Sequence, residues 1–572
     1  MHVFMFYFCN VMTNQIQKQF KKQKNMRKIT LLMLLAFVAM FTNAQIARYV
    51  KVSTTGTGDG TSWENAAGTA DIQTQINAVA AETNQGTVYF AAGTYLISAQ
   101  IQLKNNVQLM GGYAADGSGT RDLLNNQTIL DGQFNKRILY TGDASPNVAF
   151  TKITKVDGFI LQRGSSSYGS AAAISIGTVL ENCIIRNNNG STFGAAVFIK
   201  RHATISSPTN GWNQGAALVN CVIANNSSSS YAGAIFVNQD THFSLVNCVV
   251  ANNKSTDATA TTGVGGLYWG TNVRFSRVSN NIFYNNTATS GKTNILLQVS
   301  NQVEAAVYNN YFSDAAFSDV DFTAANGNKL TGDIASPGFA APTSFQGHDA
   351  AKMTEIAAAD WRLSSTSGLI GLGSTASGRA DIPYPYVATT FGGVARAYTT
   401  VTTDVQGSSR IINTTVEMGA YEYNPVIITT ASANVSQGTV TAGVTVSKGS
   451  SVTVTATPEA GYKFTKWNNG TSDVSTSAAY TFVPAADVTM TAMFETDLGT
   501  GTKTPNQELA IRISGSNLTI NGNGNLEIYN ILGKRIANNQ IRQEMTFRLD
   551  AGIYVVRLTT QEGKKVQKIK ID

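Results

Sequence analysis

The stretch that decides the fold is LENCIIRNN, at Leu180–Asn188. It returns as LVNCVIANN at 218–226, as LVNCVVANN at 245–253 and as VSNNIFYNN at 278–286, and a weaker copy begins at Val307. The leading Asn stands at positions 182, 220, 247, 280 and 309, so the steps between copies are 38, 27, 33 and 29 residues. Self-similarity of this kind is typical of repeat proteins, in which each unit packs on its neighbours.

Each copy has the same local plan, which predicts an all-β fold. A short apolar strand leads into an Asn-Asn turn, a Ser/Thr/Gly stretch and a second strand such as Ala195–Ile199 or Ala234–Val237. Strands this short, at variable spacing and with no helical pattern between them, favour a right-handed parallel β-helix. Because one coil cannot bury its apolar face alone, the coils stack and like residues form ladders. We expect the repeated Asn side chains to join their amides from coil to coil.

Three cysteines recur with the repeat, at Cys183, Cys221 and Cys248. We expect them to form an interior ladder of small, buried thiols. A fourth, Cys9, lies in the N-terminal segment, and the odd number that remains excludes a complete disulfide framework. Metal binding by three thiols is the alternative, but one Cys per coil without clustered histidines matches no usual ligand spacing. We therefore predict no metal site.

The first 44 residues have the pattern of a signal peptide region. Met26 opens a basic start, residues 29–41 are apolar, and Ala44 precedes the expected cleavage point. The apolar run is too short for a comfortable membrane span, and no other stretch is long enough. Residues 14–25 are mostly polar and basic, so Met26 is the expected true start.

The C-terminal residues predict a small antiparallel β-sandwich. Leu526–Lys534 alternates and ends in a Gly-Lys turn, Phe547–Leu558 is broken at Asp-Ala-Gly, and Lys564–Asp572 closes the chain. Residues 505–572 resemble the C-terminal sorting domain of type IX secretion cargo. The resemblance implies export across both membranes of a Gram-negative cell, followed by removal of the domain and release or surface anchoring. An ordinary terminal sandwich is the alternative.

The charge of the chain follows from these two ends. Its 42 basic and 35 acidic residues give a net charge of +7. Residues 1–44 hold 6 basic and no acidic residues, and residues 501–572 hold 11 basic and 6 acidic ones, so the part between them has a net charge of −4. No basic stripe remains there, which argues against nucleic-acid binding.

Both ends of the repeat region resemble known β-helix proteins. The N-terminal strings are Tyr49–Val52, Gly58–Ala66 and Thr87–Tyr95, with an amphipathic helix that has Ile72, Ile76, Val79 and Ala80 on one face. They resemble the cap and first coil of pectin-lyase-like β-helix proteins, where the helix covers the open end of the stack. The far strings are 360–363, 370–373, 403–407 with Arg410, and 416–422. They resemble the closing signature of the choice-of-anchor class, so we expect a β-helix over 45–425.

A smaller module is expected at 426–496, followed by a linker at 497–504 that is rich in Thr and Gly. The module resembles a divergent internalin-type B-repeat. Alternation places Tyr462 and Phe464 on one strand face, most simply a core face. The module is interpreted as a spacer, with glycan binding at Trp467 as the alternative.

Catalytic chemistry has little support in the repeats. Hydrolases of this fold need clustered carboxylates, yet the only Asp-x-Asp pair, Asp319 and Asp321, follows the last clear coil. Lyases of this fold bind Ca²⁺, which needs several oxygen ligands, or use a basic residue near the sugar. We expect no cofactor; Ca²⁺ remains possible, but nothing in the sequence indicates it.

One constellation stands out from the rest of the repeats. Aligning Gly194 with Gly233 brings together the catalytic candidates Arg201, His202, Asp240 and His242, and the ligand-binding candidates are Trp212, Trp269 and Arg274. Cations, a carboxylate, imidazoles and aromatic rings on adjacent coils could bind an acidic or neutral sugar. A surface salt bridge among ordinary polar neighbours is the alternative.

These observations predict a protein that is secreted, or attached to the outer cell surface, by the type IX secretion machinery. The favoured function is adhesion or binding of a polysaccharide, either a host or an environmental glycan. A polysaccharide lyase or hydrolase and a purely structural surface protein are the alternatives.

Overall fold

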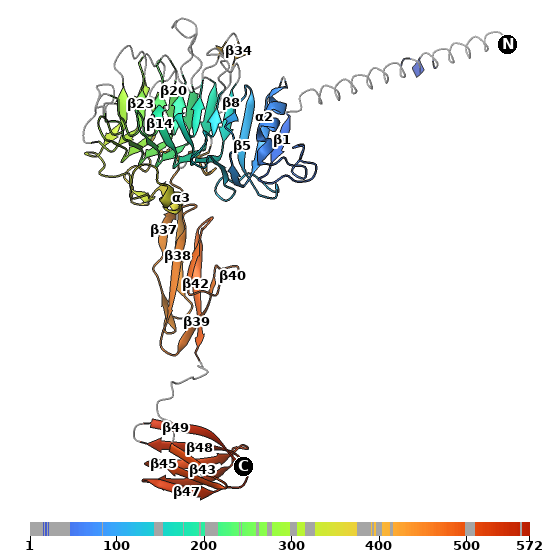
Figure 1. Cartoon of the computed structure of the whole chain (residues 1–572). Helices are drawn as coiled ribbons and strands as arrows, with labels where there is room; N and C mark the ends of the chain where they lie inside the picture. The colour runs from blue at the N-terminus through green and yellow to red at the C-terminus, as the bar shows by residue number, and fades with distance from the viewer. Residues whose placement is uncertain are drawn as a thin grey trace, which may run out of the picture. The chain divides into compact units, whose positions relative to one another are not determined.

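The computed structural model describes most of the chain from residue 46 onward (Figure 1). The described residues are 46–82, 84–141, 153–175, 177–193, 196–200, 216–239, 241, 243–258, 262–271, 277–297, 306–314, 326–374, 390–391, 394–395, 403–411, 416–497, 510–560 and 563–572, with Gln15, Lys18, Gln19 and Lys21. They form two compact units: Met1–Thr429 with Ala442–Thr453 and Thr481–Thr489, and Thr430–Thr441 with Val454–Tyr480 and Met490–Asp572. The signal peptide region at 1–44 lies outside the described residues, apart from those four positions.

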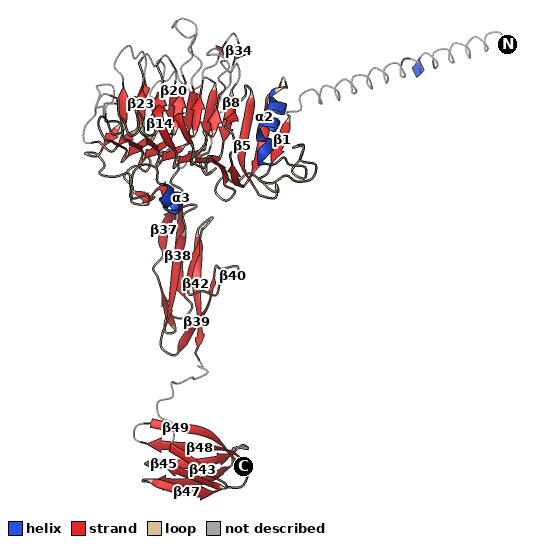
Figure 2. Cartoon of the chain, in the orientation of Figure 1, coloured by secondary structure: helices blue, strands red, loops and turns tan. Residues whose placement is uncertain are grey.

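Four parallel sheets build the first unit, and each coil contributes one short strand to a sheet (Figure 2). Sheet A has the order β1 (Ala47–Val50), β2 (Gly86–Ala91), β5 (Val107–Tyr113), β8 (Thr154–Asp157), β12 (Thr178–Glu181), β16 (Ala216–Val219), β20 (Phe243–Val246), β24 (Arg277–Ser279), β28 (Ala306–Tyr308). Sheet B has the order β3 (Gly93–Leu96), β6 (Thr128–Asp131), β9 (Phe159–Gln162), β13 (Ile184–Arg186), β17 (Val222–Ala224), β21 (Val249–Ala251), β25 (Ile282–Tyr284), β29 (Tyr311–Phe312), β30 (Lys329–Leu330).

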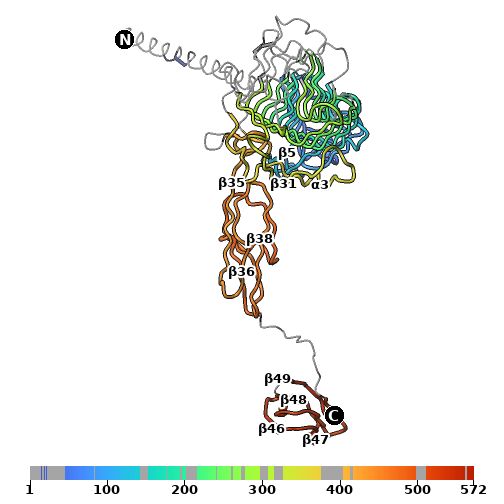
Figure 3. The backbone as a smooth tube through the Cα atoms, turned by 90° about the vertical axis from the view of Figure 1, so that its left-hand side faces the viewer, coloured from blue at the N-terminus to red at the C-terminus, as the bar shows by residue number. Residues whose placement is uncertain are grey.

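Two smaller parallel sheets complete the coils. Sheet C has the order β4 (Ile101–Gln102), β7 (Leu139–Tyr140), β11 (Ala172–Ile174), β15 (Val197–Ile199), β19 (Ile235–Val237), β23 (Leu267–Trp269), β27 (Ile295–Leu297). Sheet D has the order β10 (Ser165–Tyr168), β14 (Asn189–Phe193), β18 (Ser227–Ser228), β22 (Lys254–Ser255), β26 (Thr287–Ala288). The coils run as parallel traces from blue through green to yellow (Figure 3). The predicted parallel β-helix is therefore confirmed, and the Ser/Thr/Gly stretch of each repeat is itself a strand of sheet D.

Asparagine occupies the two sharp bends of each coil because it tolerates the left-handed backbone. Asn182, between sheets A and B, has φ 52°, and Asn187, between sheets B and D, also has φ 52°. Asn and Gly adopt this conformation more easily than other residues do. In the preceding coil Gly158 takes the first bend with φ 80°, and Arg163 the second with φ 53°. Residues 154–174, which form β8 to β11, are therefore a further coil that the Asn-based alignment missed.

The second Asn of each turn points into the coil and forms an interior ladder. Asn188, Asn226 and Asn253 are fully buried. The backbone N–H and the Nδ2 of Asn188 both donate to Oδ1 of Asn226, at 3.0 and 2.8 Å. The same pair of bonds joins Asn226 to Asn253, and Asn253 to Asn286. The predicted amide ladder is confirmed, and it satisfies polar groups that would otherwise be buried without partners.

The cysteines continue into a second ladder that changes residue type along its length. Cys183, Cys221 and Cys248 are free and fully buried, which confirms the interior thiol ladder. The N–H of Cys221 donates to Sγ of Cys248 at 3.3 Å. One coil later the N–H of Cys248 donates to Oδ1 of Asn281 at 2.8 Å, and that of Asn281 donates to Asn310 at 3.0 Å. At equivalent positions of successive coils, a thiol or a side-chain amide therefore accepts the same backbone hydrogen bond.

The N-terminal end of the stack is closed by helix α2 (Ile72–Ala80), which follows the short helix η1 (Thr69–Asp71). Ile72, Ile76 and Val79 are buried in the main core, and Ala80 packs against its edge. The predicted capping helix is confirmed, since these residues cover apolar side chains of the first coils.

A returning segment, residues 339–363 and 403–422, packs on the outer face of sheet B. It contains β31 (Phe339–Ala341), η3 (Ala350–Lys352), α3 (Met353–Ala358) and β32 (Asp360–Leu363), and β33 (Thr390–Phe391) and β34 (Val394–Ala395) form a separate hairpin. Trp361, Val405 and Tyr421 pack against outward residues of β17 and β21. Nδ2 of Asn225 donates to the carbonyl of Phe345 at 2.9 Å, and Asn187 and Asn252 bind the segment in the same way. The closing strings of the sequence thus cover one apolar face of the helix.

Buried ionisable side chains pack together at the end of the returning segment. Arg410 is fully buried, and its Nε lies 2.9 Å from Oε1 of Glu422. Burial raises the pKa of Glu422 to about 10, and Arg410 opposes this shift. Asp404 accepts from the N–H of Gln406, Ser408 and Glu422 at 2.8 to 3.0 Å.

The module that follows is built from antiparallel strands. Its sheets have the orders β37 (Val444–Ser447), β35 (Pro425–Ser432), β42 (Val488–Thr496), β39 (Tyr462–Asn468), β40 (Asp473–Ser475), and β36 (Gly438–Val440), β38 (Val452–Pro458), β41 (Ala479–Phe482). The register shifts between Phe464 and Lys466, so that Phe464 and Trp467 contact each other, with ring centroids 5.7 Å apart. Trp467 is fully buried, and its Nε1 donates to the carbonyl of Ala478. It is a core residue, which corrects the alternative of glycan binding at this ring.

The C-terminal residues form the predicted antiparallel sandwich. Its two sheets have the orders β43 (Ala510–Ser514), β44 (Asn517–Asn521), β47 (Glu544–Arg548), and β46 (Arg535–Ile541), β45 (Gly524–Asn530), β48 (Gly552–Thr560), β49 (Gly563–Ile571). Leu526, Ile528, Val556 and Leu558 are among its buried core residues.

The mixed ladder predicts how Cys248 responds to substitution. Cys248→Asp buries a carboxylate without a partner, so we expect it to lower the free energy of unfolding by more than about 4 kcal/mol. The side chain in Cys248→Asn has nearly the same shape as that in Cys248→Asp, but it is uncharged and it copies Asn281 of the next coil. This variant should therefore retain most of the stability of the wild type. Thermal unfolding of both variants measures this difference. In the folded wild type, all three thiols should resist alkylation; rapid labelling, or equal destabilisation by Asn and Asp, would contradict the interior ladder.

Candidate functional site

The outer face of sheet A carries a network of four charged side chains. Nη2 of Arg121 lies 2.6 Å from Oδ1 of Asp157. Nζ of Lys155 lies 3.1 Å from Oδ2 of Asp157 and 2.8 Å from Oε2 of Glu181. Asp157 and Glu181 are register partners on β8 and β12, so adjacent coils place their carboxylates on one ammonium group.

Strand alternation and two anchors place these groups. Val156 points into the core and is fully buried, so Lys155 and Asp157 on either side of it point outward. Arg121 comes from the loop between β5 and β6, where its Nε donates to the carbonyl of Gly111 at 2.7 Å. Asn182, at the first bend of the next coil, donates from Nδ2 to Oδ1 of Asp157 at 2.9 Å.

The network separates the proton affinities of its two carboxyl groups. Burial alone would raise the pKa of Asp157, but Arg121 and Lys155 hold it below its usual value. Burial, and then the neighbouring Asp157, raise the pKa of Glu181, while Lys155 opposes this shift. Burial would lower the pKa of Lys155, but its two carboxylates raise it. Carboxyl groups with opposite shifts can divide the roles of proton donor and ionised partner.

Four aromatic rings adjoin the charges on the first coils. Tyr49 stacks on Tyr89 with centroids 5.5 Å apart and lies 4.9 Å from Trp63. Tyr113 lies 5.7 Å from Trp63 and meets Tyr89 edge to face at 5.3 Å. All four rings are partly exposed.

The rings and the charges lie on consecutive strands of sheet A, because the register pairs Tyr89 of β2 with Met110 of β5, and Met110 with Asp157 of β8. We call this surface the sheet A platform: Tyr49, Trp63, Tyr89, Tyr113, Arg121, Lys155, Asp157 and Glu181. Rings beside fixed donors and acceptors are what binding sites for sugars require.

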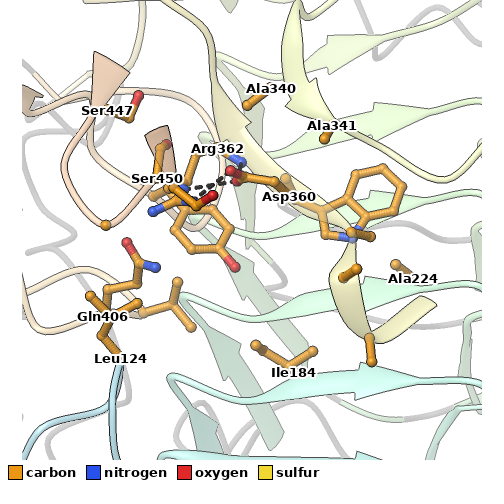
Figure 4. Close-up of a pocket in the computed structure, with 18 of the residues that line it drawn as sticks. Leu124, Ile184, Ala224, Ala340, Ala341, Asp360, Arg362, Gln406, Ser447 and Ser450 are labelled. Atoms are coloured by element: carbon orange, nitrogen blue, oxygen red, sulfur yellow. Dashed lines mark hydrogen bonds and ion pairs between the residues drawn. The ribbon is translucent and has the colours of Figure 1, made fainter. Parts of the chain in front are cut away.

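A separate cavity of about 560 Å³ lies between sheet B and the returning segment (Figure 4). Arg362 and Asp360 face each other there, with Nη2–Oδ2 and Nε–Oδ1 distances of 2.6 and 2.8 Å. Nη1 of Arg362 donates to the carbonyl of Lys448, and Arg186 donates to Gln162. Burial lowers the pKa of Arg186 to about 10. Since these cations are engaged with the chain itself, we assign the cavity a structural role.

Most of the constellation predicted from the sequence, called here the sequence-predicted strip, lies outside the described residues. Six of its residues lie outside the described residues: Arg201, His202, Trp212, Asp240, His242 and Arg274. Asp319 and Asp321 also lie outside them. Trp269 is described, and it corrects one expectation: its ring is fully buried in the main core, because its position on β23 faces inward, so it cannot stack on a surface ligand.

All the platform residues except Glu181 belong to coils without the Asn signature, so the alignment on Asn did not bring them together. Asp157 precedes Gly158 just as Glu181 precedes Asn182. Aligning on bends that accept a left-handed backbone, Gly or Asn, would have paired the two carboxylates 24 positions apart. Nowhere in the described residues do three or more His, Cys, Asp or Glu side chains gather in a way that could hold a metal ion.

Comparison with known families divides the chain into three parts. Residues 49–256 match the family described as rhamnogalacturonase A/epimerase, pectate lyase-like. Residues 428–498 match the divergent InlB B-repeat domain, and residues 506–572 match the secretion system C-terminal sorting domain. No curated protein matches the chain.

In the part of the chain that the structure describes, no helix is both long and apolar enough to span a membrane. The chain thus joins a β-helix similar to pectate-lyase-like domains, a module similar to divergent B-repeats and a type IX sorting domain, and the protein is secreted or attached to the cell surface.

Proposed function

We propose that the protein binds a polysaccharide on the sheet A platform and serves adhesion to a host or environmental glycan. The observation that carries the proposal is that partly exposed rings and the Lys155 network lie on consecutive strands of sheet A, in a register that leads from Tyr89 through Met110 to Asp157. Sugar C–H faces pack on aromatic rings, and fixed charges bind hydroxyl groups.

The scaffold supports binding because it is rigid beneath the platform. Val88, Leu109, Val156 and Leu180 lie under it and are fully buried in the main core. Side chains that stand on such strands lose little freedom when a ligand arrives, so more of the contact energy appears as affinity. Export to the cell exterior gives a glycan-binding face access to its ligand.

Hydrolysis is the second candidate, favoured by one observation. Asp157 and Glu181 share Lys155, and their pKa values shift in opposite directions, as a general acid and an ionised carboxylate require. If the platform is catalytic, Glu181→Gln and Asp157→Asn should each abolish release of reducing ends while the polysaccharide still binds. No product from the wild type on any retained polysaccharide would rule hydrolysis out for those ligands.

The rings predict a loss of affinity on truncation. Trp63→Ala and Tyr89→Ala should each weaken binding at least about tenfold, because a sugar loses its apolar contact. Tyr168→Ala is the matched control: this ring is 44% exposed but lies on sheet D. Retardation in polysaccharide affinity gels measures the effect, with thermal unfolding to check the fold. Equal retardation of the ring variants and the wild type would place binding elsewhere, or leave the protein with a structural role.

The sequence-predicted strip is tested separately. If Arg201 and His242 contribute to binding, Arg201→Ala with His242→Ala should reduce retention while the melting curve stays almost unchanged. The same polysaccharide panel gives the measurement. A double variant that binds like the wild type would leave the platform as the proposed site.

The sorting domain predicts where a shortened chain accumulates. A truncation that ends near Leu498 lacks residues 506–572 and should remain in the periplasm, because the machinery has no sorting domain to act on. Immunoblots of periplasm, cell surface and medium measure this. Normal yield of the truncated protein outside the cell would contradict the export route.

A further inference from the structure

We infer that the sheet A platform selects neutral polysaccharides and rejects polyuronates, an inference that rests on the proposed binding function. An acidic sugar needs a cation that is free to pair with its carboxylate. The platform has two cations, Arg121 and Lys155, and the question is whether either is free.

Both cations already pair with carboxylates of the protein. Arg121 pairs with Asp157 at 2.6 Å, and its Nε is held by the carbonyl of Gly111 at 2.7 Å. Lys155 bridges Asp157 and Glu181 at 3.1 and 2.8 Å. The four charges sum to zero, and each positive group has at least one carboxylate within ion-pair distance.

The charges around the rings repeat this balance. Hydrogen bonds from Thr61, and to a smaller extent Arg48, lower the pKa of Asp59. Hydrogen bonds from Ser62 and Ser118, and to a smaller extent Lys51, lower the pKa of Glu64 and Asp116. Nζ of Lys51 also donates to the backbone carbonyl of Asp116 at 2.7 Å. The platform and these five neighbours together have four cations and five carboxylates among the described residues. The local electrostatic field therefore does not attract a polyanion.

A uronate would have to compete with Glu181 for Lys155, or bind the third N–H of Lys155 beside the carboxylates of Asp157 and Glu181, whose negative charges repel it. The side chain of Glu181 is 16% exposed and that of Lys155 24% exposed, so an incoming carboxylate would meet both together. Displacement would leave Glu181 partly buried beside Asp157 without its ammonium partner, which costs free energy that the new pair must first offset. Rejection of acidic sugars is therefore built into the pairing.

A neutral sugar meets no such obstacle. Its hydroxyl groups can donate to Glu181 and accept from Lys155 while the ion pair stays intact. Its apolar face can pack on the exposed parts of Trp63 and Tyr89. The same residues thus favour one class of ligand and oppose the other.

The first experiment uses the mature chain from residue 45. Affinity gels contain neutral galactan, arabinan, xyloglucan or mixed-linkage β-glucan in one set, and polygalacturonate or alginate in the other. Retardation by at least one neutral polymer and by neither polyuronate is the expected result. Retardation by a polyuronate as strong as that by any neutral polymer would overturn the inference and leave the proposed function standing. Binding to no polymer would overturn both.

The second experiment tests the cause of rejection. Glu181→Gln keeps the shape of the side chain but removes one of the two carboxylates that neutralise Lys155, which then pairs with Asp157 alone. Affinity for polygalacturonate should therefore rise at least tenfold and fall again in high salt. The matched control is Glu495→Gln, which makes the same charge change and frees Lys463 of an exposed pair on β39 and β42. No gain in Glu181→Gln, or an equal gain in both variants, would overturn the inference. The wild-type comparison needs no variant, so it decides even where Glu181→Gln fails to fold.

Discussion

The β-helix depends on satisfying polar groups inside its bends. Each of the coils from β8 to β26 turns sharply twice within a few residues, and a residue with a left-handed backbone stands at each of these bends. Asn meets both demands, because it tolerates that backbone and its amide bonds the next coil. Each such bond stabilises the fold by about 1 kcal/mol, whereas a buried amide without a partner costs about 1 to 3 kcal/mol. The ladder thereby fixes the register of the strands, and the strand register in turn aligns the platform.

The sequence predicted those parts of the fold that repeat visibly. Asn and Cys recur at fixed offsets, so the ladders and the parallel coils followed from their spacing. Gly158 and Arg163 occupy the same two bends in the preceding coil, but they are not Asn, so the alignment on Asn did not identify that coil. Alternation was applied only to Tyr462 and Phe464, and it did not predict that Trp467 is buried, because a shift in register between Phe464 and Lys466 changes which side chains face the core. Such a shift depends on the pairing of two strands, which alternation along one strand cannot show.

The candidate site was harder to predict than the fold for a physical reason. Its carboxylates are brought together by stacking of coils, so their separation in sequence depends on the lengths of loops. Arg121 comes from a loop outside the repeat and has no periodic partner. Composition was also a poor guide, because the charges cancel within the network. The strip found by alignment rests on histidines and arginines whose positions lie outside the described residues, so it remains a proposal.

The amides at the first bend also have a direction. Nδ2 of Asn247 donates to Asn220, that of Asn220 to Asn182, and that of Asn182 to Asp157, at 3.2, 3.1 and 2.9 Å. The three bonds run the same way, so their dipoles add, as peptide dipoles do along an α-helix, and the positive end rests on the carboxylate. Asp157 therefore stands at the end of a chain of amide hydrogen bonds that crosses three coils. The bond from Asn182 lowers the pKa of Asp157, although Arg121 and Lys155 lower it more, and the amide of Asn182 is itself bonded by the next coil.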